Sequence, residues 1–255
     1  MRERFRLKET SAWITADEWK YIEIAKEELT KRRTELERFV RCHPFFLVTL
    51  EPYLPKPFPT AYQTEEPETV RRMLESAGKF GVGPMSAVAG TLAELAVEAM
   101  RDAGARHAIV DNGGDVALLS DREVLVGIYA GSESPFSNRI ALKIRPSSPS
   151  SSRPSLVGVC TSSGTVGHSI SFGNADAATV VSGSASLSDA AATTLCNSVT
   201  DASSAPQAFR TVSQVAGVKG AVVICKDTLA SWGEVELVRL KALNALNAPQ
   251  NCQHE

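Results

Sequence analysis

The spacing of apolar residues predicts five helices. A helix with a mostly charged outer face begins near residue 16 and runs to about residue 42, and a second covers residues 66–79. A third begins at Gly83-Pro84, where Met85, Val88, Leu92 and Leu95 keep one apolar face. The last two cover residues 187–199 and 206–216. A capping box, Thr15-Ala-Asp-Glu18, is predicted to start the first of them.

Short apolar runs between turn residues predict the strands, at 4–10, 12–15, 107–110, 116–119, 123–130, 138–144, 157–160, 177–181, 221–225, 229–232 and 235–240. Asp111-Asn-Gly-Gly-Asp115 between two of these runs is a strong hairpin signal. Residues 104–111 and 217–224 resemble each other as helix–Gly–strand joints, which suggests a duplicated unit. Strands joined by hairpins, with helices in pairs, favour an α+β fold with an antiparallel sheet.

The composition is that of an ordinary globular chain, with 43% hydrophobic and 22% charged residues over 255 positions and a net charge of −2. Nothing in this charge balance favours a nucleic-acid partner or a membrane partner. Five cysteines without a C-x-x-C pair favour reduced thiols and a cytoplasmic location. We expect one domain over residues 1–255, with a mobile, Ser- and Pro-rich loop at residues 145–155.

Residues 154–209 contain no Lys, Arg or Glu, and Ser, Thr, Gly and Ala dominate this stretch. Because solvated surfaces normally carry long charged side chains, the stretch predicts either disorder or a site built from backbone and short hydroxyl groups. The strand at 177–181 and the helix at 187–199 argue against disorder.

Asp189 and Thr193 are four residues apart and therefore share a helix face. A carboxylate next to a hydroxyl suits Mg²⁺, which binds oxygen ligands. Ser186-x-x-Asp189 also resembles a capping box, so from the residues alone Asp189 is as readily a helix cap as a metal ligand. We take Leu187 and Ala191 as part of a buried stripe that leaves Asp189 and Thr193 on the opposite face.

Further candidate contacts for a ligand come from turns and helix ends. The paired glycines Gly113 and Gly114 would let a ligand approach the backbone, with Asn112 or Asp115 bonding to it, unless the segment is only a turn. Met85 and Ser86 stand at a helix start that could receive a phosphate. Hydroxyl groups and amides for an anion are offered by Thr161, Ser162, Ser163, Gly164 and Thr165.

Two residues are candidates for catalysis. His168, between Gly167 and Ser169, is a candidate acid/base, although a lone histidine is more often structural. Cys160 could form a nucleophile–base pair with His168. A small buried cysteine is the more common case.

Four sequence blocks follow one another along the chain: Gly81-Val-Gly-Pro-Met-Ser-Ala-Val-Ala-Gly90, Asn112-Gly-Gly-Asp115, residues 158–173, and Ser188-Asp-Ala-Ala-Ala-Thr193. They resemble an uncharacterised, largely prokaryotic family that is itself similar to ApbE, the FAD:protein FMN transferase. The resemblance covers nearly the whole chain. It implies duplicated α+β units related to the tunnelling fold, with FAD and Mg²⁺ as ligands.

The resemblance also implies roles for single residues. Ser188-Asp-Ala-Ala-Ala-Thr193 matches the transferases' Ala-Asp-Ala-Leu-Ala-Thr, which gives Asp189 and Thr193 the metal role. His168 matches the transferases' histidine before Asp-Pro-Arg-Thr-Gly, and Ser169-Ile-Ser-Phe-Gly173 replaces that motif. Ala87 stands near the place of a transferase lysine. Two cationic contacts to a diphosphate are therefore absent from these motifs.

The expected function is Mg²⁺-dependent binding of a flavin or nucleotide, with transfer of FMN or a phosphoryl group, or hydrolysis, as the reaction. One alternative is a ligand-binding protein without catalysis, and a weaker one is a Cys160-dependent hydrolase. The expected partner is a small flavin or nucleotide rather than a nucleic acid or a membrane. A homo-oligomer remains compatible with the sequence.

Overall fold

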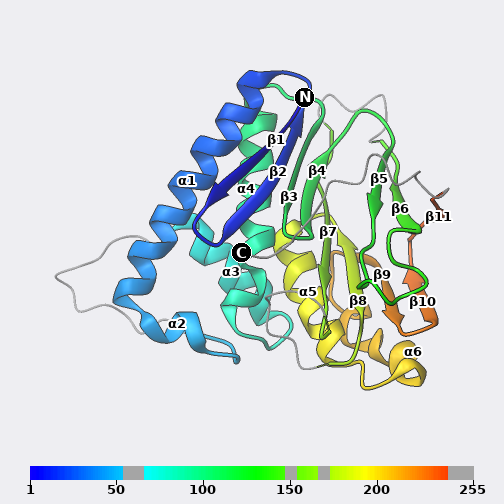
Figure 1. The fold of residues 1–255 in the computed structure, drawn as a ribbon. Helices are drawn as coiled ribbons and strands as arrows, with labels where there is room; N and C mark the ends of the chain where they lie inside the picture. The colour runs from blue at the N-terminus through cyan, green and yellow to red at the C-terminus, as the bar shows by residue number, and fades with distance from the viewer. Residues whose placement is uncertain (54–65, 147–153, 166–172, 241–255) are drawn as a thin grey trace.

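A computed structural model describes residues 1–53, 66–146, 154–165 and 173–240. Eight strands form one antiparallel sheet in the order β1-β2-β3-β4-β7-β8-β9-β10, and a second sheet has the order β11-β6-β5 (Figure 1). The strands are β1 (Arg2–Leu7), β2 (Thr10–Ala16), β3 (Ala108–Asn112), β4 (Asp115–Leu119), β5 (Val124–Gly127), β6 (Ile140–Ile144), β7 (Val157–Ser162), β8 (Ala177–Ser182), β9 (Val218–Cys225), β10 (Thr228–Gly233) and β11 (Leu237–Arg239).

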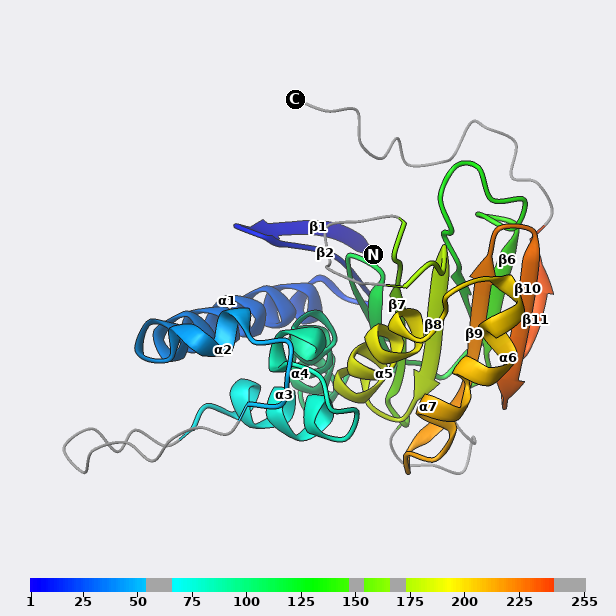
Figure 2. The same cartoon turned by 90° about the horizontal axis from the view of Figure 1, so that it is seen from below.

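Helices pack on one face of the large sheet, and the small sheet covers part of the other face (Figure 2). The helices are α1 (Trp19–Cys42), α2 (Pro44–Val48), α3 (Glu68–Gly78), η2 (Pro84–Ala87), α4 (Val88–Asp102), α5 (Ala185–Asn197), η3 (Ala202–Ser204), α6 (Ala205–Ala208) and α7 (Arg210–Ser213). The α+β class and the antiparallel sheet predicted from the sequence are therefore confirmed.

The topology repeats itself. Two strands, a group of helices and two more strands occur first as β1-β2, α1 to α4, β3-β4, and again as β7-β8, α5 to α7, β9-β10. Strands β4 and β7 join the two halves by antiparallel pairing. Each return to the sheet passes through a glycine with positive φ, Gly104 at 102° and Gly217 at 98°. The sequence similarity of these two joints therefore reflects equivalent positions in a duplicated unit.

Helix α5 is buried nearly all round, which differs from the expected amphipathic pattern. The consecutive residues Ala185, Ser186, Leu187 and Ser188 point to four different sides of the helix, and all four are buried. α5 contacts β7 and β8 on one side and α3 and α4 on others (Figure 2). Because neighbours surround it, small side chains are required on nearly every face, and this explains the Ala- and Ser-rich composition.

Two local expectations are corrected. Thr15 lies within β2, where it pairs with Ile109, so it cannot cap α1. Glu18 is the N-cap of α1, and its side chain makes no capping bond. The region expected as one helix at 206–216 is the pair α6 and α7. Most of the loop expected at 145–155 lies outside the described residues.

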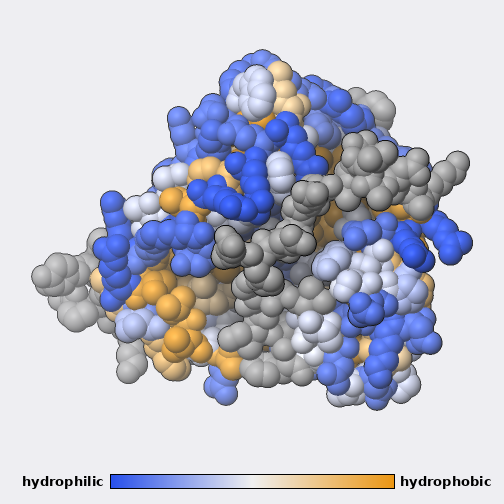
Figure 3. All heavy atoms as spheres, in the orientation of Figure 1, coloured by the Kyte–Doolittle hydropathy of each residue, from blue (hydrophilic) through white to orange (hydrophobic). Residues whose placement is uncertain are grey.

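The short helix α2 and the residues just after it present four exposed apolar side chains, which appear as an orange patch at the lower left of the surface in Figure 3. These are Phe45, Leu47, Val48 and Leu50. On the opposite side of α2, Phe46 is fully buried against Phe39 of α1. The α2 helix is therefore anchored by one aromatic residue. Among the described residues, no helix is long and apolar enough to cross a membrane.

Candidate functional site

Polar side chains gather on the helix-covered face of the large sheet, where β4, β7, α4 and α5 meet. Asp115 on β4 pairs directly with Cys160 on β7, so their side chains point to the same face. Ser162 lies two residues beyond Cys160 and therefore shares that face. Close above them, α4 and α5 touch at Gly90, where an added Cβ would lie 2.3 Å from the carbonyl oxygen of Ala185.

Asp189 is the central carboxylate of this cluster. It is 6% exposed, and its Oδ2 accepts a 2.8 Å hydrogen bond from the amide of Gly90 in the first turn of α4. The N-cap of its own helix is Ser184, whose side chain accepts from the amide of Leu187. Asp189 therefore caps α4 rather than α5, and the Ser186-x-x-Asp189 interpretation as a cap of α5 is wrong.

Burial raises the pKa of Asp189 to about 7, although hydrogen bonds from the amides of Gly90 and Ala89 partly offset this effect. Burial and the nearby charge of Asp189 raise the pKa of Asp115 well above its usual range. No Lys, Arg or His among the described residues forms an ion pair with either carboxylate. The two acids therefore lie close together in a buried place where a cation or a proton must balance their charge.

Asp115 has an unused oxygen. The side chain interacts with the Cys160 thiol and the Thr161 amide, but its Oδ1 is fully buried and has no hydrogen-bond partner among the described residues. A buried carboxylate oxygen without a partner is costly. This atom is the feature of the cluster that calls for a further ligand.

The β3–β4 hairpin holds Asp115 in place. Gly113 and Gly114 both have positive φ, 75° and 103°, as a two-residue hairpin turn requires. The side-chain amide of Asn112 donates to the carbonyl oxygen of Ala89 at 3.2 Å. The turn is thus tied to the start of α4, next to the amides that bind Asp189.

Thr193 joins the cluster through β7. Its hydroxyl lies 3.2 Å from that of Ser162, and Thr193 is only half-buried. The Asp189–Thr193 spacing places both residues along one side of α5, as the sequence predicted. Asp115, Ser162, Asp189 and Thr193 together provide two carboxylates and two hydroxyls around the same place.

Not every candidate lies in this cluster. The Thr161 hydroxyl bonds to that of Thr179 at 2.9 Å, on the opposite face of the sheet. Further along, Gly164 donates to the carbonyl oxygen of Ala175, and Thr165 bonds to Asp176 at 2.9 Å. These contacts, together with that of Ser163 to Ala175, tie the segment to the start of β8.

Met85 and Ser86 lie in η2, before α4. Met85 packs against an apolar cluster, and the Ser86 hydroxyl donates to the carbonyl oxygen of Gly83 at 2.7 Å. The Ser86 hydroxyl therefore spends its hydrogen-bond donor on a contact within the turn. His168 lies outside the described residues, so its place relative to the cluster stays a prediction.

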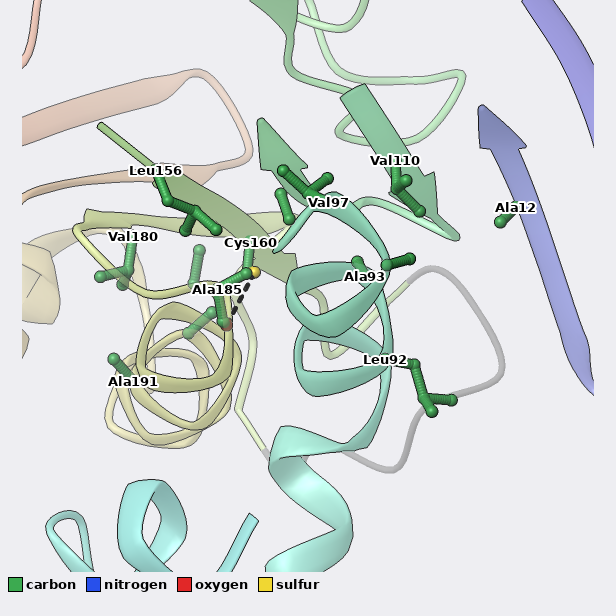
Figure 4. Packing of buried hydrophobic residues seen from close by; sticks show 14 of the residues in the cluster. Ala12, Leu92, Ala93, Val97, Val110, Leu156, Cys160, Val180, Ala185 and Ala191 are labelled. Atoms are coloured by element: carbon green, nitrogen blue, oxygen red, sulfur yellow. Dashed lines mark hydrogen bonds between the residues drawn. The ribbon is translucent and has the colours of Figure 1, made fainter. Parts of the chain in front are cut away.

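Cys160 is fully buried between α4 and α5, and its thiol donates to the carbonyl oxygen of Ala185 at 3.3 Å (Figure 4). Burial, and then the charge of Asp115, raise the pKa of this thiol well above its usual value. Because the thiolate is the nucleophilic form, this environment opposes the Cys160-dependent hydrolase.

Iodoacetamide should therefore leave Cys160 unmodified in the folded protein at pH 8, while the exposed Cys42 reacts. Mass spectrometry of chymotryptic peptides measures both residues in one sample. Denatured protein, in which both cysteines should react, is the control. If Cys160 in the folded protein were labelled as fast as Cys42, the result would support the Cys160-dependent hydrolase.

Glu94 on α4 is a residue that the sequence patterns did not single out. Its Oε2 accepts from the amide of Ser186 at 2.9 Å and from the Ser184 hydroxyl at 2.7 Å, both at the start of α5. Asp189 of α5 does the same for the start of α4. Each helix thus gives a carboxylate to the other's N-terminus, where the helix dipole favours negative charge. The signal that could have singled out Glu94 in the sequence is a glutamate within an otherwise apolar helix.

The residues of the cluster fit a Mg²⁺ ion. All four side chains offer oxygen ligands, and the buried Asp115 Oδ1 lacks a partner. Among the described residues, no group of three or more His, Cys, Asp or Glu side chains could hold a metal. One or two carboxylates are what Mg²⁺ takes from proteins when phosphates and water complete its shell.

The duplicated antiparallel sheet with helices on one face is a fold that this chain shares with solved proteins. The chain has the fold of the flavinyl transferase ApbE from Pseudomonas stutzeri, solved in its apo form. The TM-score is 0.52 at 10% identity, over 91% of this chain and 94% of that one.

A family model described as "AbpE bacteria" matches residues 2–231, and the chain belongs to this ApbE-like family. It is 50% identical over 236 residues to a UPF0280 protein of Methanosarcina acetivorans, covering 92% of this chain and 87% of the relative. A UPF0280 protein of Methanococcoides burtonii is 47% identical over 236 residues, covering 92% and 93%. The family resemblance inferred from the motifs is therefore confirmed.

Proposed function

We propose that this protein binds a flavin or nucleotide together with Mg²⁺ and catalyses transfer or hydrolysis at its diphosphate. The observation that carries the proposal is the buried pair Asp115 and Asp189, which has an unpartnered oxygen and no cationic neighbour among the described residues. A bound Mg²⁺ would neutralise phosphate charge there. The flavin transferase ApbE, whose fold this chain shares, makes FAD the first ligand to test.

Asp189 and Thr193 would hold the metal, and the unpartnered Asp115 Oδ1 would add a third oxygen. The amide of Gly90 keeps the Asp189 carboxylate in one orientation, so this side chain would lose little conformational entropy when the ion binds. Burial in an apolar surrounding strengthens the attraction between these carboxylates and a divalent cation.

The ligand's diphosphate would lie at the open side of the cluster, beside the half-buried Thr193. Asn112, Gly113 and Gly114 form the neighbouring turn, whose exposed glycines allow close approach of a ribose or base. Ser162 is proposed as an outer contact of the phosphates, because its hydroxyl lies 3.2 Å from that of Thr193. His168 is proposed as the acid/base.

In the reaction, the bond between a phosphorus and the bridging oxygen of the diphosphate breaks. The new oxygen comes from water in hydrolysis, or from an acceptor hydroxyl in transfer, and that group loses its proton. From FAD the products are AMP and either free or protein-bound FMN. We place the reaction in the cytoplasm, because five cysteines without a C-x-x-C pair favour reduced thiols.

Incubating the purified protein with FAD and Mg²⁺ should release AMP, with FMN either free or attached to added acceptor protein. Chromatography measures the two nucleotides, and mass spectrometry measures the acceptor. Asp189→Asn should reduce the rate at least tenfold, because it removes a charge that holds the metal. Asp201→Asn, on an exposed cap elsewhere, is the matched control.

Mn²⁺ binding, followed by electron paramagnetic resonance without any flavin, tests the metal part separately. If FAD, FMN and ATP with Mg²⁺ cause neither turnover nor a change in melting temperature, the proposal is wrong. Thermal stabilisation by a flavin without turnover would instead support a non-catalytic binding protein. The observation that keeps this alternative in place is the absence from the sequence motifs of the two cationic contacts to a diphosphate that the transferases' motifs supply.

A further inference from the structure

The outermost strand of the large sheet, β1, has one edge with which no described strand pairs (Figure 1). On its other side, β1 pairs with β2 along six consecutive residues without a bulge. Met1 and Ala16 exchange both backbone hydrogen bonds, at 2.7 and 3.1 Å. Because bonded and non-bonded pairs alternate in an antiparallel ladder, the backbone N–H and C=O groups of Arg2, Arg4 and Arg6 point to the free edge.

The side chains of the same three arginines share one face of the sheet. This face is opposite to the helices, because Phe5, between Arg4 and Arg6, packs against the core that the helices cover. All three arginines are exposed, and Figure 3 shows strongly hydrophilic side chains over β1 and β2 on this face. Alternate residues of a strand are about 6.7 Å apart, so the three charges form a regular row.

Trp13, which is the cross-strand neighbour of Arg4 on β2, orders two of these side chains. The Cζ atom of Arg2 lies 4.6 Å from the centroid of the Trp13 ring, and that of Arg4 lies 5.7 Å from it. Arg4 Nη2 also donates to the Ser11 hydroxyl at 3.3 Å. Stacking on an aromatic ring leaves the in-plane N–H donors of a guanidinium available, so these groups are positioned in advance for carboxylates.

The positive charge on this face is not balanced within the described part of the chain. None of the three β1 arginines forms an ion pair there. On the same face, β3 contributes one carboxylate, Asp111, which lies opposite Trp13. The other acidic residues of the β1–β2 hairpin already have cationic partners: Glu3 with Lys26, Glu9 with Arg33, and Asp17 with Arg122.

Charge and stacking decide which kind of partner fits this edge. A second copy paired through β1 would place arginines against arginines on one face, and like charges in that arrangement are destabilising. A nucleic-acid base would need the face of the Trp13 ring, which Arg2 already covers. An extended segment with acids at alternate positions has the same spacing as the arginines, and it finds opposite charges in register.

We propose that the free edge of β1 receives an extended acidic segment of another protein as an additional strand. Backbone hydrogen bonds form with Arg2, Arg4 and Arg6, and acidic side chains of the segment pair with their guanidinium groups. Charged side chains on an edge reject uncharged and like-charged strands, and these arginines therefore admit an acidic one selectively. The surface lies on the face of the sheet opposite to the carboxylate cluster, and it does not depend on the proposed reaction.

A labelled synthetic peptide, in which glutamate alternates with valine and threonine, tests this surface by fluorescence anisotropy at low ionic strength. The test variant carries Arg2→Gln, Arg4→Gln and Arg6→Gln. The control variant, which loses the same net charge at exposed positions elsewhere, carries Arg139→Gln, Arg210→Gln and Arg239→Gln. The wild type and the control variant should bind the peptide equally, and the test variant should bind it about tenfold more weakly.

Two N-methylated peptides distinguish strand addition from charge attraction alone. Methylation of the glutamate amides blocks addition antiparallel to β1, and methylation of the intervening amides blocks parallel addition. One methylated peptide should therefore lose binding to the wild type while the other keeps it. Because this comparison uses only the wild-type protein, it also decides the matter if the test variant does not fold.

Equal binding of the two methylated peptides overturns the proposal. It is also overturned if the wild type does not bind the acidic peptide, or if the test variant binds it as tightly as the wild type. Tighter binding of single-stranded oligothymidylate than of the peptide would identify a nucleic-acid surface instead. A dimer of the wild type that the test variant loses would show that the edge pairs with a second copy.

Discussion

Asp189→Asn should remove much of the loss of stability that the metal-free protein undergoes between pH 5 and pH 8. In the wild type, burial raises the pKa of Asp189 from 3.8 to about 7. The folded state therefore keeps a proton that the unfolded chain has already lost above pH 4. Stability is greatest below the unfolded pKa, falls as the pH rises, and levels off above about pH 7.

The loss assigned to Asp189 between pH 5 and pH 8 is up to about 2–3 kcal/mol, or roughly 5–10 °C in melting temperature for a chain of this size. Asp115 acts in the same direction, because its pKa is raised too. Asparagine cannot ionise, and its side-chain oxygen can still accept from the Gly90 amide. Melting curves of both proteins at pH 5 and pH 8, without divalent metal, measure the difference.

Asp201→Asn serves as the control, because the pKa of Asp201 is lowered by hydrogen bonds from Ser203 and Ser204. It should keep the wild-type pH dependence in this range. Mg²⁺ should stabilise the wild type more at pH 8 than at pH 5, because the ion and the proton compete for the same carboxylates. A pH dependence identical in the wild type and Asp189→Asn would show that Asp189 ionises normally.

Gly90→Ala should destabilise the protein and weaken its metal binding, although alanine is the better helix former. Alanine would gain up to about 1 kcal/mol of helix propensity. Against this, its Cβ would lie 2.3 Å from the carbonyl oxygen of Ala185 and 2.8 Å from Cβ of Asp189. Overpacking against backbone costs about 1–3 kcal/mol, so the collision outweighs the propensity.

Gly78→Ala is the matched control, because Gly78 also lies in a helix and an added Cβ there meets nothing within 4 Å. It should be neutral or slightly stabilising. Chemical denaturation gives the free energy of unfolding for both variants, and Mn²⁺ titration gives the metal affinity. Gly90→Ala with wild-type values in both measurements would mean that α4 and α5 do not approach each other this closely.

The local patterns of the sequence predicted most of the elements correctly. Alternating and helical periodicities located the strands and the larger helices, and Asn112-Gly-Gly-Asp115 gave the β3–β4 hairpin. These features depend on neighbours within a few residues, so the sequence carries them directly. The Asp189–Thr193 spacing placed both side chains along one side of α5 for the same reason.

Contacts between distant segments were beyond those patterns. The bond from Gly90 to Asp189 spans 99 residues, and the bond from Ser186 to Glu94 spans 92. The capping-box interpretation at Thr15 failed because Thr15 is paired within the sheet. The one at Ser186 failed because the N-cap of α5 is two residues earlier, at Ser184. Tertiary partners decided where both helices begin.

The sequence by itself determined the α+β class, the family and the residues Asp115, Asp189 and Thr193 as candidates, because composition and local spacing express them. Only the tertiary structure decided which candidates meet. β-strand register placed Ser162 facing α5 and turned Thr161 to the opposite face, a difference of one residue. The packing of α4 on α5 then buried two carboxylates together, and this burial, rather than the residue types alone, sets their charge.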